Sequence, residues 1–159
     1  MLIRPPRPDE AEPLADLHLT TWRETYADHF PPSAWGAEAR EARVQLWTAI
    51  CSAPRPDSRT AVAELDGRVV GFAHAGRNVD DPPPRERQLW FIYLLASAQG
   101  SGAGQALLDE VLGDDPASLW VLEVNPRARA FYVKNAFAPD GARQPSGFDG
   151  APDEIRMVR

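Results

Sequence analysis

The sequence contains little cysteine, little lysine and no long hydrophobic run. Cys51 is the single cysteine among 159 residues, so an intrachain disulfide framework and a cysteine-cluster metal site are both excluded. No stretch approaches the roughly 20 apolar residues that a membrane-spanning helix needs, and residues 1–6 lack the hydrophobic run of a signal peptide. We therefore expect a soluble, cytoplasmic protein with no membrane partner and no bound metal.

The charge balance is acidic, and Lys134 is the one lysine among 17 basic residues. Against these stand 23 acidic residues, which gives a formal net charge of −6. Nucleic-acid binding favours a basic surface, so this balance disfavours nucleic acid as a partner and favours a cationic or neutral one. With 43% hydrophobic residues and five tryptophans, the chain has enough apolar surface to fold. Its length predicts one domain over residues 1–159.

The first half of the chain shows the periodicities of two helices and a β-hairpin. The predicted elements are a strand at Leu2 and Ile3, a helix that starts at an Asp9–Glu12 capping box and carries Leu14, His18, Trp22 and Tyr26 on one face, a helix over 37–51, and strands over 61–65 and 69–74. The dipeptide Asp66-Gly67 supplies the positive φ angles of a tight turn between these two strands. The strands therefore form an antiparallel pair.

The second half predicts a parallel unit. It begins with a nearly all-apolar strand over 89–95, which is followed by a glycine-rich turn, a helix ended by Gly113 and a second apolar strand over 119–124. This order is that of a right-handed crossover between parallel strands. Asn125 and Pro126 are suited to the N-cap and first position of another helix. Closing strands are expected at 137–138 and 154–158. The sequence thus predicts a mixed α/β sheet with a hairpin first and a parallel unit later.

The glycine-rich turn spans residues 99–104, between the predicted 89–95 strand and the helix after it. Such a turn gathers free backbone N–H groups at the positive end of a helix dipole, so it predicts an anion site. The dinucleotide-binding pattern G-x-G-x-x-G is excluded because its last glycine would fall on Gln105 or Leu107. A Walker loop is excluded because no glycine here precedes lysine.

Two motifs occur in order along this half of the chain. Gln99 to Gly104 has the pattern Q-x-x-G-x-G, directly after Leu89-Trp90-Phe91-Ile92-Tyr93-Leu94. Asn125 to Tyr132 has the pattern N-x-x-A-x-x-F-Y. The first resembles the pyrophosphate-binding turn and preceding fourth strand of the GNAT family of acyl-CoA-dependent N-acetyltransferases, and the second resembles that family's tyrosine helix. A weaker likeness covers the rest of the chain. The resemblance implies an α/β (α+β) fold with a mainly antiparallel sheet around a central parallel βαβ unit flanked by helices.

The resemblance also implies acetyl-CoA as co-substrate and assigns residues to it. Tyr132 would donate its phenolic proton to the departing thiolate, and Asn125 would hold the pantetheine amide. Arg127, Arg129 or Lys134 could meet a CoA phosphate. The implied acetyl-CoA-binding set, mostly through backbone N–H groups, is Leu94, Leu95, Gln99, Gly100, Ser101, Gly102, Ala103, Gly104, Asn125 and Tyr132.

The general base is where the sequence departs from the family. Gln88 stands at a strand position where some members carry a glutamate, and a glutamine amide is a poor proton acceptor. Glu86, two residues earlier, and Glu123, on the next strand, are the carboxylate candidates. The histidine candidates are His74 and His29. Deprotonation through ordered water, without a dedicated base, is equally open.

Another departure is Ala136, where the family usually has glycine after the tyrosine helix. Asn135 tolerates the left-handed conformation, so we expect it to take that role and to shift the helix end.

The acceptor pocket is expected between the first two helices and the loop before Leu89, with Trp22, Tyr26, Phe30 and Trp35 shaping it. The predicted function is transfer of an acetyl group from acetyl-CoA to a primary amine of a small molecule or peptide, by direct attack in a ternary complex. The alternative is a non-catalytic acyl-CoA-binding sensor or partner module, which Gln88 motivates. Edge strands near the C-terminus would permit a homodimer.

Overall fold

One seven-stranded sheet organises the chain, which the computed structural model describes over residues 1–148 and 150–159. Its strand order is β1-β2-β3-β4-β5-β7-β6. The strands are β1 (Leu2–Arg4), β2 (Arg59–Leu65), β3 (Arg68–Arg77), β4 (Arg87–Leu94), β5 (Ala117–Leu122), β6 (Ala138–Gln144) and β7 (Glu154–Val158). Strands β4 and β5 are parallel, and every other neighbouring pair is antiparallel. The predicted mixed, mainly antiparallel sheet with a central parallel unit is confirmed.

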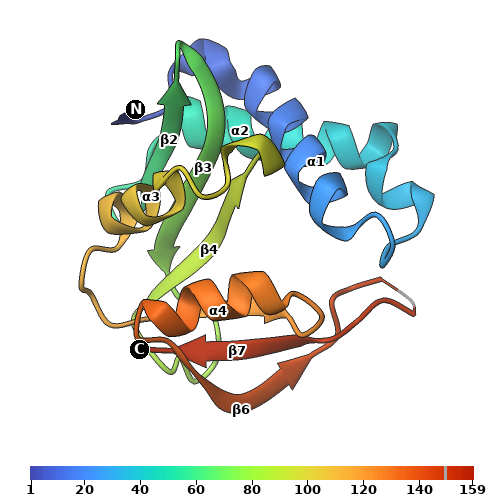
Figure 1. Ribbon diagram of the computed structural model, residues 1–159, viewed down its shortest axis with the longest axis vertical. Helices are drawn as coiled ribbons and strands as arrows, with labels where there is room; N and C mark the ends of the chain where they lie inside the picture. Colours follow the sequence, from blue (N-terminus) through green and yellow to red (C-terminus); the bar gives the residue numbers. More distant parts are fainter. Residues whose placement is uncertain (149) are drawn as a thin grey trace.

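Four helices cover the two faces of this sheet (Figure 1). They are α1 (Ala11–Tyr26), α2 (Ala37–Ser52), α3 (Ala103–Val111) and α4 (Pro126–Lys134), and short 3-10 turns lie at Pro8–Glu10, Pro32–Trp35 and Ala96–Ala98. Helices α1 and α2 pack together on one face, where Leu14 and Trp47 contact Val62 and Phe72. Helices α3 and α4 lie on the other face.

Side-chain size decides how closely α3 approaches the sheet. The β2 and β3 residues that face it are alanines, such as Ala61 and Ala73, both fully buried. Leu107 and Leu108 of α3 pack on this flat surface without any exposed area. The alternation of small residues on this face with Val62 and Phe72 on the other is the period-2 pattern of strands buried on both sides.

The start of α1 differs from the prediction. Asp9 was expected to cap the helix, but the carboxylate of Glu10 accepts the Arg7 N–H at 2.7 Å instead. Glu10 also forms a 2.6 Å ion pair with Arg4 of β1. A 3-10 turn over Pro8–Glu10 places α1 after it, from Ala11, with no side-chain cap. The predicted Asp9–Glu12 capping box is wrong. Glu10, the residue after Asp9, accepts the backbone hydrogen bond instead, because its carboxylate is held by Arg4 of β1.

The end of α4 also differs. Ala136, and not Asn135, adopts the left-handed conformation, with φ of +65° against −99° for Asn135. Both ends of the Asn135 side-chain amide are engaged, since it donates to Phe131 O and accepts from Gln105 of α3, at 2.9 and 2.8 Å. These contacts hold Asn135 in its observed conformation, so Ala136 adopts the left-handed conformation that ends the helix. In contrast, the predicted N-cap Asn125 and first residue Pro126 of α4 are confirmed.

Within residues 1–148 and 150–159, no helix combines the length and the apolar character that crossing a bilayer requires.

Candidate active site

The parallel strands β4 and β5 separate in the middle of the sheet. They pair only where Arg87–Leu89 runs beside Ala117–Leu119. On the other side of β4, the register against β3 slips, because His74 pairs with Phe91 but Ala75 pairs with Leu89. Trp90 is therefore the extra residue of a β-bulge, and bulges bend the strand that carries them. Beyond this point the two parallel strands leave an opening between them.

A cavity of about 490 Å³ lies at this opening. It is lined by both separated strands, by the end of α1, by the glycine turn and by α4. The structure brings most of the predicted acetyl-CoA-binding and acceptor residues to its wall: Trp22, Tyr26, Phe30, Leu94, Gln99, Gly100, Gly102, Gly104, Asn125 and Tyr132. The wall thus joins segments that lie far apart in the sequence.

The glycine turn has the conformation that a backbone anion site requires. Gly100 and Gly102 have φ of +81° and +87°, which glycine adopts without steric cost. Within the described residues, the N–H groups of Gly102, Gly104 and Gln105 find no protein acceptor. These groups lie at the first turn of α3, where the helix dipole adds positive potential. The turn is therefore a cradle for an anionic group.

The other small residues of the turn serve packing. A Cβ built on Gly104 would lie 3.2 Å from Leu94 Cδ1, so glycine here allows α3 to approach β4. Ser101 closes the turn by donating to Ala98 O at 2.6 Å. Ala103 is fully buried in the core. Of these three, Ser101 and Ala103 do not line the cavity.

The two predicted N–H donors at the end of β4 point in different directions. Leu95 N–H donates to Val70 O of β3 at 2.9 Å, so it is already paired. Because successive N–H groups of a strand point to opposite edges, Leu94 N–H faces the open edge toward β5. Leu94 lines the cavity and Leu95 does not. The structure thus keeps Leu94, and not Leu95, as a backbone donor at the opening.

Tyr132 of α4 lines the cavity with only 7% of its surface exposed. Burial is the main cause that raises the pKa of its phenol well above the ordinary value. The group therefore stays protonated at any physiological pH. A buried neutral phenol on a cavity wall is a proton donor that does not compete with solvent.

Asn125 links α4 to α1 across the cavity. Its Oδ1 caps α4 by accepting Ala128 N–H at 3.0 Å, and its Nδ2 donates to the Tyr26 hydroxyl at 2.9 Å. One N–H of its amide is left for a ligand. Asn125 therefore has a structural role of its own beside any contact with a co-substrate.

The end of the cavity near α1 is aromatic. Trp22 packs on Phe30 and Tyr26 with ring centroids 4.8 and 5.7 Å apart. Tyr26 and Phe30 also belong to the core, with 5% and 7% of their surfaces exposed. Trp35 packs edge to face against Trp22, with ring centroids 5.4 Å apart, but does not line the cavity. The expected acceptor residues thus form one aromatic cluster. It contributes to the core and also lines one end of the cavity.

The carboxylates predicted as general bases lie elsewhere. Glu86 precedes β4 and lines a separate depression beside Asp80 and Asp81. Glu123 pairs with Arg143 at 2.9 Å, and this hydrogen bond lowers the pKa of the carboxyl group, the opposite of what a base at neutral pH needs. Neither residue lines the cavity.

The remaining candidates are also outside the cavity wall. His74 Nδ1 lies 2.7 Å from Thr60 Oγ1, its ring stacks on Phe91, and burial lowers its pKa. His29 is exposed beyond α1. Gln88 is buried, and its Oε1 finds no hydrogen-bond partner among the described residues. The identity of Gln88 therefore says nothing about proton transfer in the cavity.

Glu154, which sequence reasoning missed, is the carboxylate on the wall among the described residues. It begins β7, pairs with Leu122 of β5 and accepts a hydrogen bond from Gln144 at 2.8 Å. The sequence carries a partial signal, because Glu154 and Arg156 alternate with the apolar Ile155 and Met157. That alternation places both polar residues on one face, but it does not say that the face belongs to the cavity.

Comparisons with known proteins agree with this geometry. The sequence profile of the Acetyltransferase (GNAT) family matches residues 14–137. The chain is 27% identical to the probable N-acetyltransferase Rv2775 of Mycobacterium tuberculosis, over 87% of this chain and 80% of that protein.

Solved structures share the fold at low sequence identity. The PaiA N-acetyltransferase of Thermoplasma acidophilum, solved with coenzyme A, is 20% identical and superposes with a TM-score of 0.72 over 99% of this chain and 98% of its own. The ribosomal-protein-alanine N-acetyltransferase of Brucella melitensis is 20% identical with a TM-score of 0.72, over 100% and 99% of the two chains. Fold, splayed strands, glycine turn and profile match together show that this chain belongs to the GNAT acetyltransferase family.

Proposed function

We propose that the protein transfers an acetyl group from acetyl-CoA to a primary amine of a small molecule or peptide, by direct attack in a ternary complex. The observation that carries this proposal is the composition of the cavity at the splayed strands. Its wall joins a backbone anion cradle, a buried phenol and an aromatic pocket that holds one carboxylate. Acyl transfer to an amine needs these parts together.

The binding of acetyl-CoA is supported by residues that fit its chemistry. The free N–H groups at Gly102, Gly104 and Gln105 suit a pyrophosphate, and Leu94 N–H at the open edge suits an amide or thioester carbonyl. When bound, acetyl-CoA supplies an acyl group activated as a thioester. Arg127 and Lys134 lie on the same wall and add positive charge.

Tyr132 is the proposed acid. Its raised pKa keeps the phenol protonated at neutral pH, so the proton is available to the sulfur as the C–S bond breaks and negative charge develops on the leaving thiolate. The aromatic cluster around Trp22 is the proposed acceptor end. A purely acyl-CoA-binding sensor receives no support from Gln88, because this residue lies outside the cavity.

The test removes one oxygen atom. Tyr132→Phe is expected to lower kcat by roughly 10²-fold or more, because an acid that acts in the transition state is lost. The acetylated product is quantified by mass spectrometry with a broad panel of amines and peptides, and acetyl-CoA affinity is measured by calorimetry. Affinity is expected to stay near the wild-type value, since the phenol ring remains.

Two results would contradict the proposal. Wild-type turnover in the variant would remove Tyr132 from the mechanism. Tight acetyl-CoA binding without any acetylated product across the panel would favour the sensor.

A further inference from the structure

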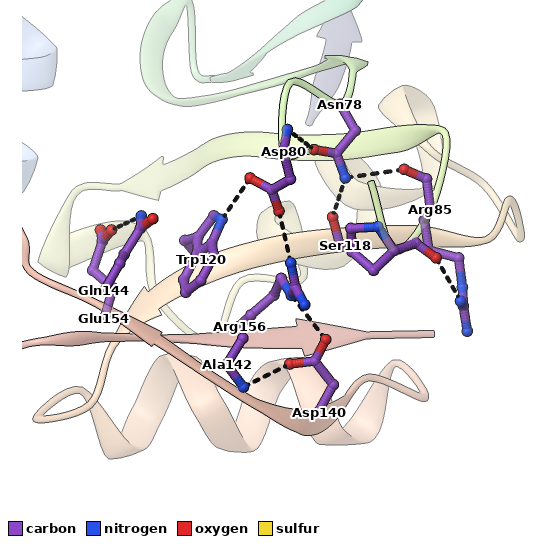
Figure 2. Close-up of polar contacts among 11 residues, drawn as sticks. Asn78, Asp80, Arg85, Ser118, Trp120, Asp140, Ala142, Gln144, Glu154 and Arg156 are labelled. Carbon is purple, nitrogen blue, oxygen red and sulfur yellow. Dashed lines mark hydrogen bonds and ion pairs between the residues drawn. The ribbon is translucent and has the colours of Figure 1, made fainter. Parts of the chain in front are cut away.

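Among the described residues, the carboxylates Asp80, Glu123, Asp140 and Asp153 near the C-terminal hairpin have arginine partners, and Glu154 does not. Arg156 lies 3.1 Å from Asp80 and 2.8 Å from Asp140, as Figure 2 shows. Arg143 binds Glu123 at 2.9 Å and approaches Asp153 at 3.7 Å. These two arginines offset part of the negative charge of the four carboxylates.

Glu154 is the exception. No cationic side chain lies within 4.0 Å of it among the described residues, and its recorded partner is the Gln144 amide at 2.8 Å. An amide orients a carboxylate but does not neutralise it. Glu154 therefore lies at the wall of the cavity without a cationic partner among the described residues.

Arg156, the cationic side chain on the same face of β7 as Glu154, does not pair with it. Arg156 is two residues along β7, so it shares the face, but its guanidinium is committed to Asp80 and Asp140. Figure 2 shows Gln144 and Glu154 on one side of Trp120 and Arg156 on the other. The Trp120 indole is fixed by a 3.3 Å hydrogen bond to Asp80 and lies 5.4 Å from the Arg156 guanidinium carbon. The contacts of Arg156 with Asp80 and Asp140 thus keep its guanidinium from forming an ion pair with Glu154.

Aromatic side chains share the cavity wall with Glu154. Trp22, Tyr26, Phe30 and Trp120 line the same cavity. Burial is the main cause that raises the pKa of Tyr26; the hydrogen bond from Asn125 and the charge of Arg127 lower it, and the charge of Glu154 raises it. A carboxylate and aromatic rings on one cavity wall can both attract an organic cation.

We propose that Glu154 binds the ammonium group of the incoming acceptor, which passes one proton to water before it attacks as the free base, and that the acceptor is a cationic amine with an apolar alkyl or arylalkyl body packed on the aromatic wall. This inference rests on the proposed function and names its substrate class. One carboxylate matches one positive charge. An acceptor with a carboxylate beside its amine is disfavoured, because like charges would meet at Glu154.

The test compares two amines of similar shape with the variant Glu154→Gln. Phenethylamine is a cation at neutral pH, whereas 4-ethylaniline is neutral. For phenethylamine, we expect the variant to raise KM by about tenfold or more, because a charge-assisted contact is lost. For 4-ethylaniline, and for acetyl-CoA, KM is expected to change by less than about twofold. Glu110→Gln, an exposed α3 residue outside the cavity, is the matched charge control.

A binding measurement separates failure of this inference from failure of the proposed function. The affinity of phenethylamine is measured by calorimetry with CoA present, in wild type, Glu154→Gln and Glu154→Asp, after thermal unfolding confirms that each variant is folded. Weaker binding in Glu154→Gln, partly restored in Glu154→Asp, supports the inference even if no product forms. Absence of binding to wild type, an unchanged affinity in Glu154→Gln, or an equal loss for both amines would overturn it.

Discussion

His18 is a buried histidine inside an aromatic cage. Phe72, Phe91 and Tyr93 surround its ring at centroid distances of 5.0 to 5.3 Å. Its Nδ1 finds no hydrogen-bond partner among the described residues. Burial is the main cause that lowers its pKa to about 3, and the nearby Arg43 lowers it further. The folded protein therefore holds this side chain neutral.

This burial makes stability depend on pH. The folded pKa of about 3 lies below the ordinary value of 6.5, so the contribution of neutral His18 is fully present above about pH 6.5 and is lost as the pH falls toward 3. Between about pH 7.5 and pH 5, the wild type should lose about 2 kcal/mol more unfolding free energy than His18→Leu does. Urea unfolding at the two pH values measures this difference.

The control is His29→Gln, which changes an exposed histidine. It should keep the wild-type pH dependence. The partly buried His74 is present in all three proteins, and its lowered pKa contributes equally to each. Equal pH dependence in wild type and His18→Leu would show that His18 is accessible to protons in the folded state.

At the scale of elements, local signals located most helices and strands but not every end. Asn125 and Pro126 were predicted to start α4, and they do, because a cap and its helix lie within four residues. Asp9 and Asn135 were assigned wrongly. In the first case Arg4 of β1 recruits Glu10, and in the second Gln105 of α3 engages Asn135. Both errors come from side chains of other elements, which local patterns do not contain.

The strained end of α4 yields a stability prediction. Ala136 has φ of +65°, where a Cβ is disfavoured by about 1 kcal/mol. Ala136→Gly should raise the unfolding free energy by up to about 1 kcal/mol, because relief of strain exceeds the added entropy of the unfolded chain. Denaturant unfolding is the measurement.

The matched control is Ala130→Gly in the interior of the same helix. Ala130 is exposed and helical, so glycine there should lower stability by about 1 kcal/mol. If both glycine variants were destabilising by similar amounts, Ala136 would not be strained in the folded protein.

At the scale of the whole molecule, a hydrogen bond beside the cavity links the elements on the two faces of the sheet. Tyr26 comes from α1 on one face of the sheet, and Asn125 starts α4 on the other. Their hydrogen bond passes the opening between β4 and β5. It therefore joins the predicted acceptor end to the tyrosine helix.

A double-mutant cycle tests this link. Asn125→Ala loses the helix cap and the contact with Tyr26, so it should cost about 1–2 kcal/mol of unfolding free energy. Tyr26→Phe should cost about 1 kcal/mol. The double variant should cost less than the sum by about 1 kcal/mol, because the shared hydrogen bond is lost once.

Asn125→Ser keeps a cap acceptor and removes the contact with Tyr26, so it separates the two roles. Urea unfolding of all four variants gives the coupling. Strict additivity would mean that the contact between α1 and α4 is absent in solution.

The sequence by itself determined the local chemistry of this protein. The glycine turn and the cap of α4 were predicted because each depends on residues close together in the chain. The parallel unit was predicted from the order strand, turn, helix, strand, and the place of Tyr132 from the family resemblance. Only the tertiary structure decided which carboxylate reaches the cavity. Glu154 reaches it because β7 pairs with β5, whereas Glu86 and Glu123 lie elsewhere. The pairing of Leu95 with Val70 was decided in the same way. Strand neighbours and register depend on packing between distant segments, so no local pattern specifies them.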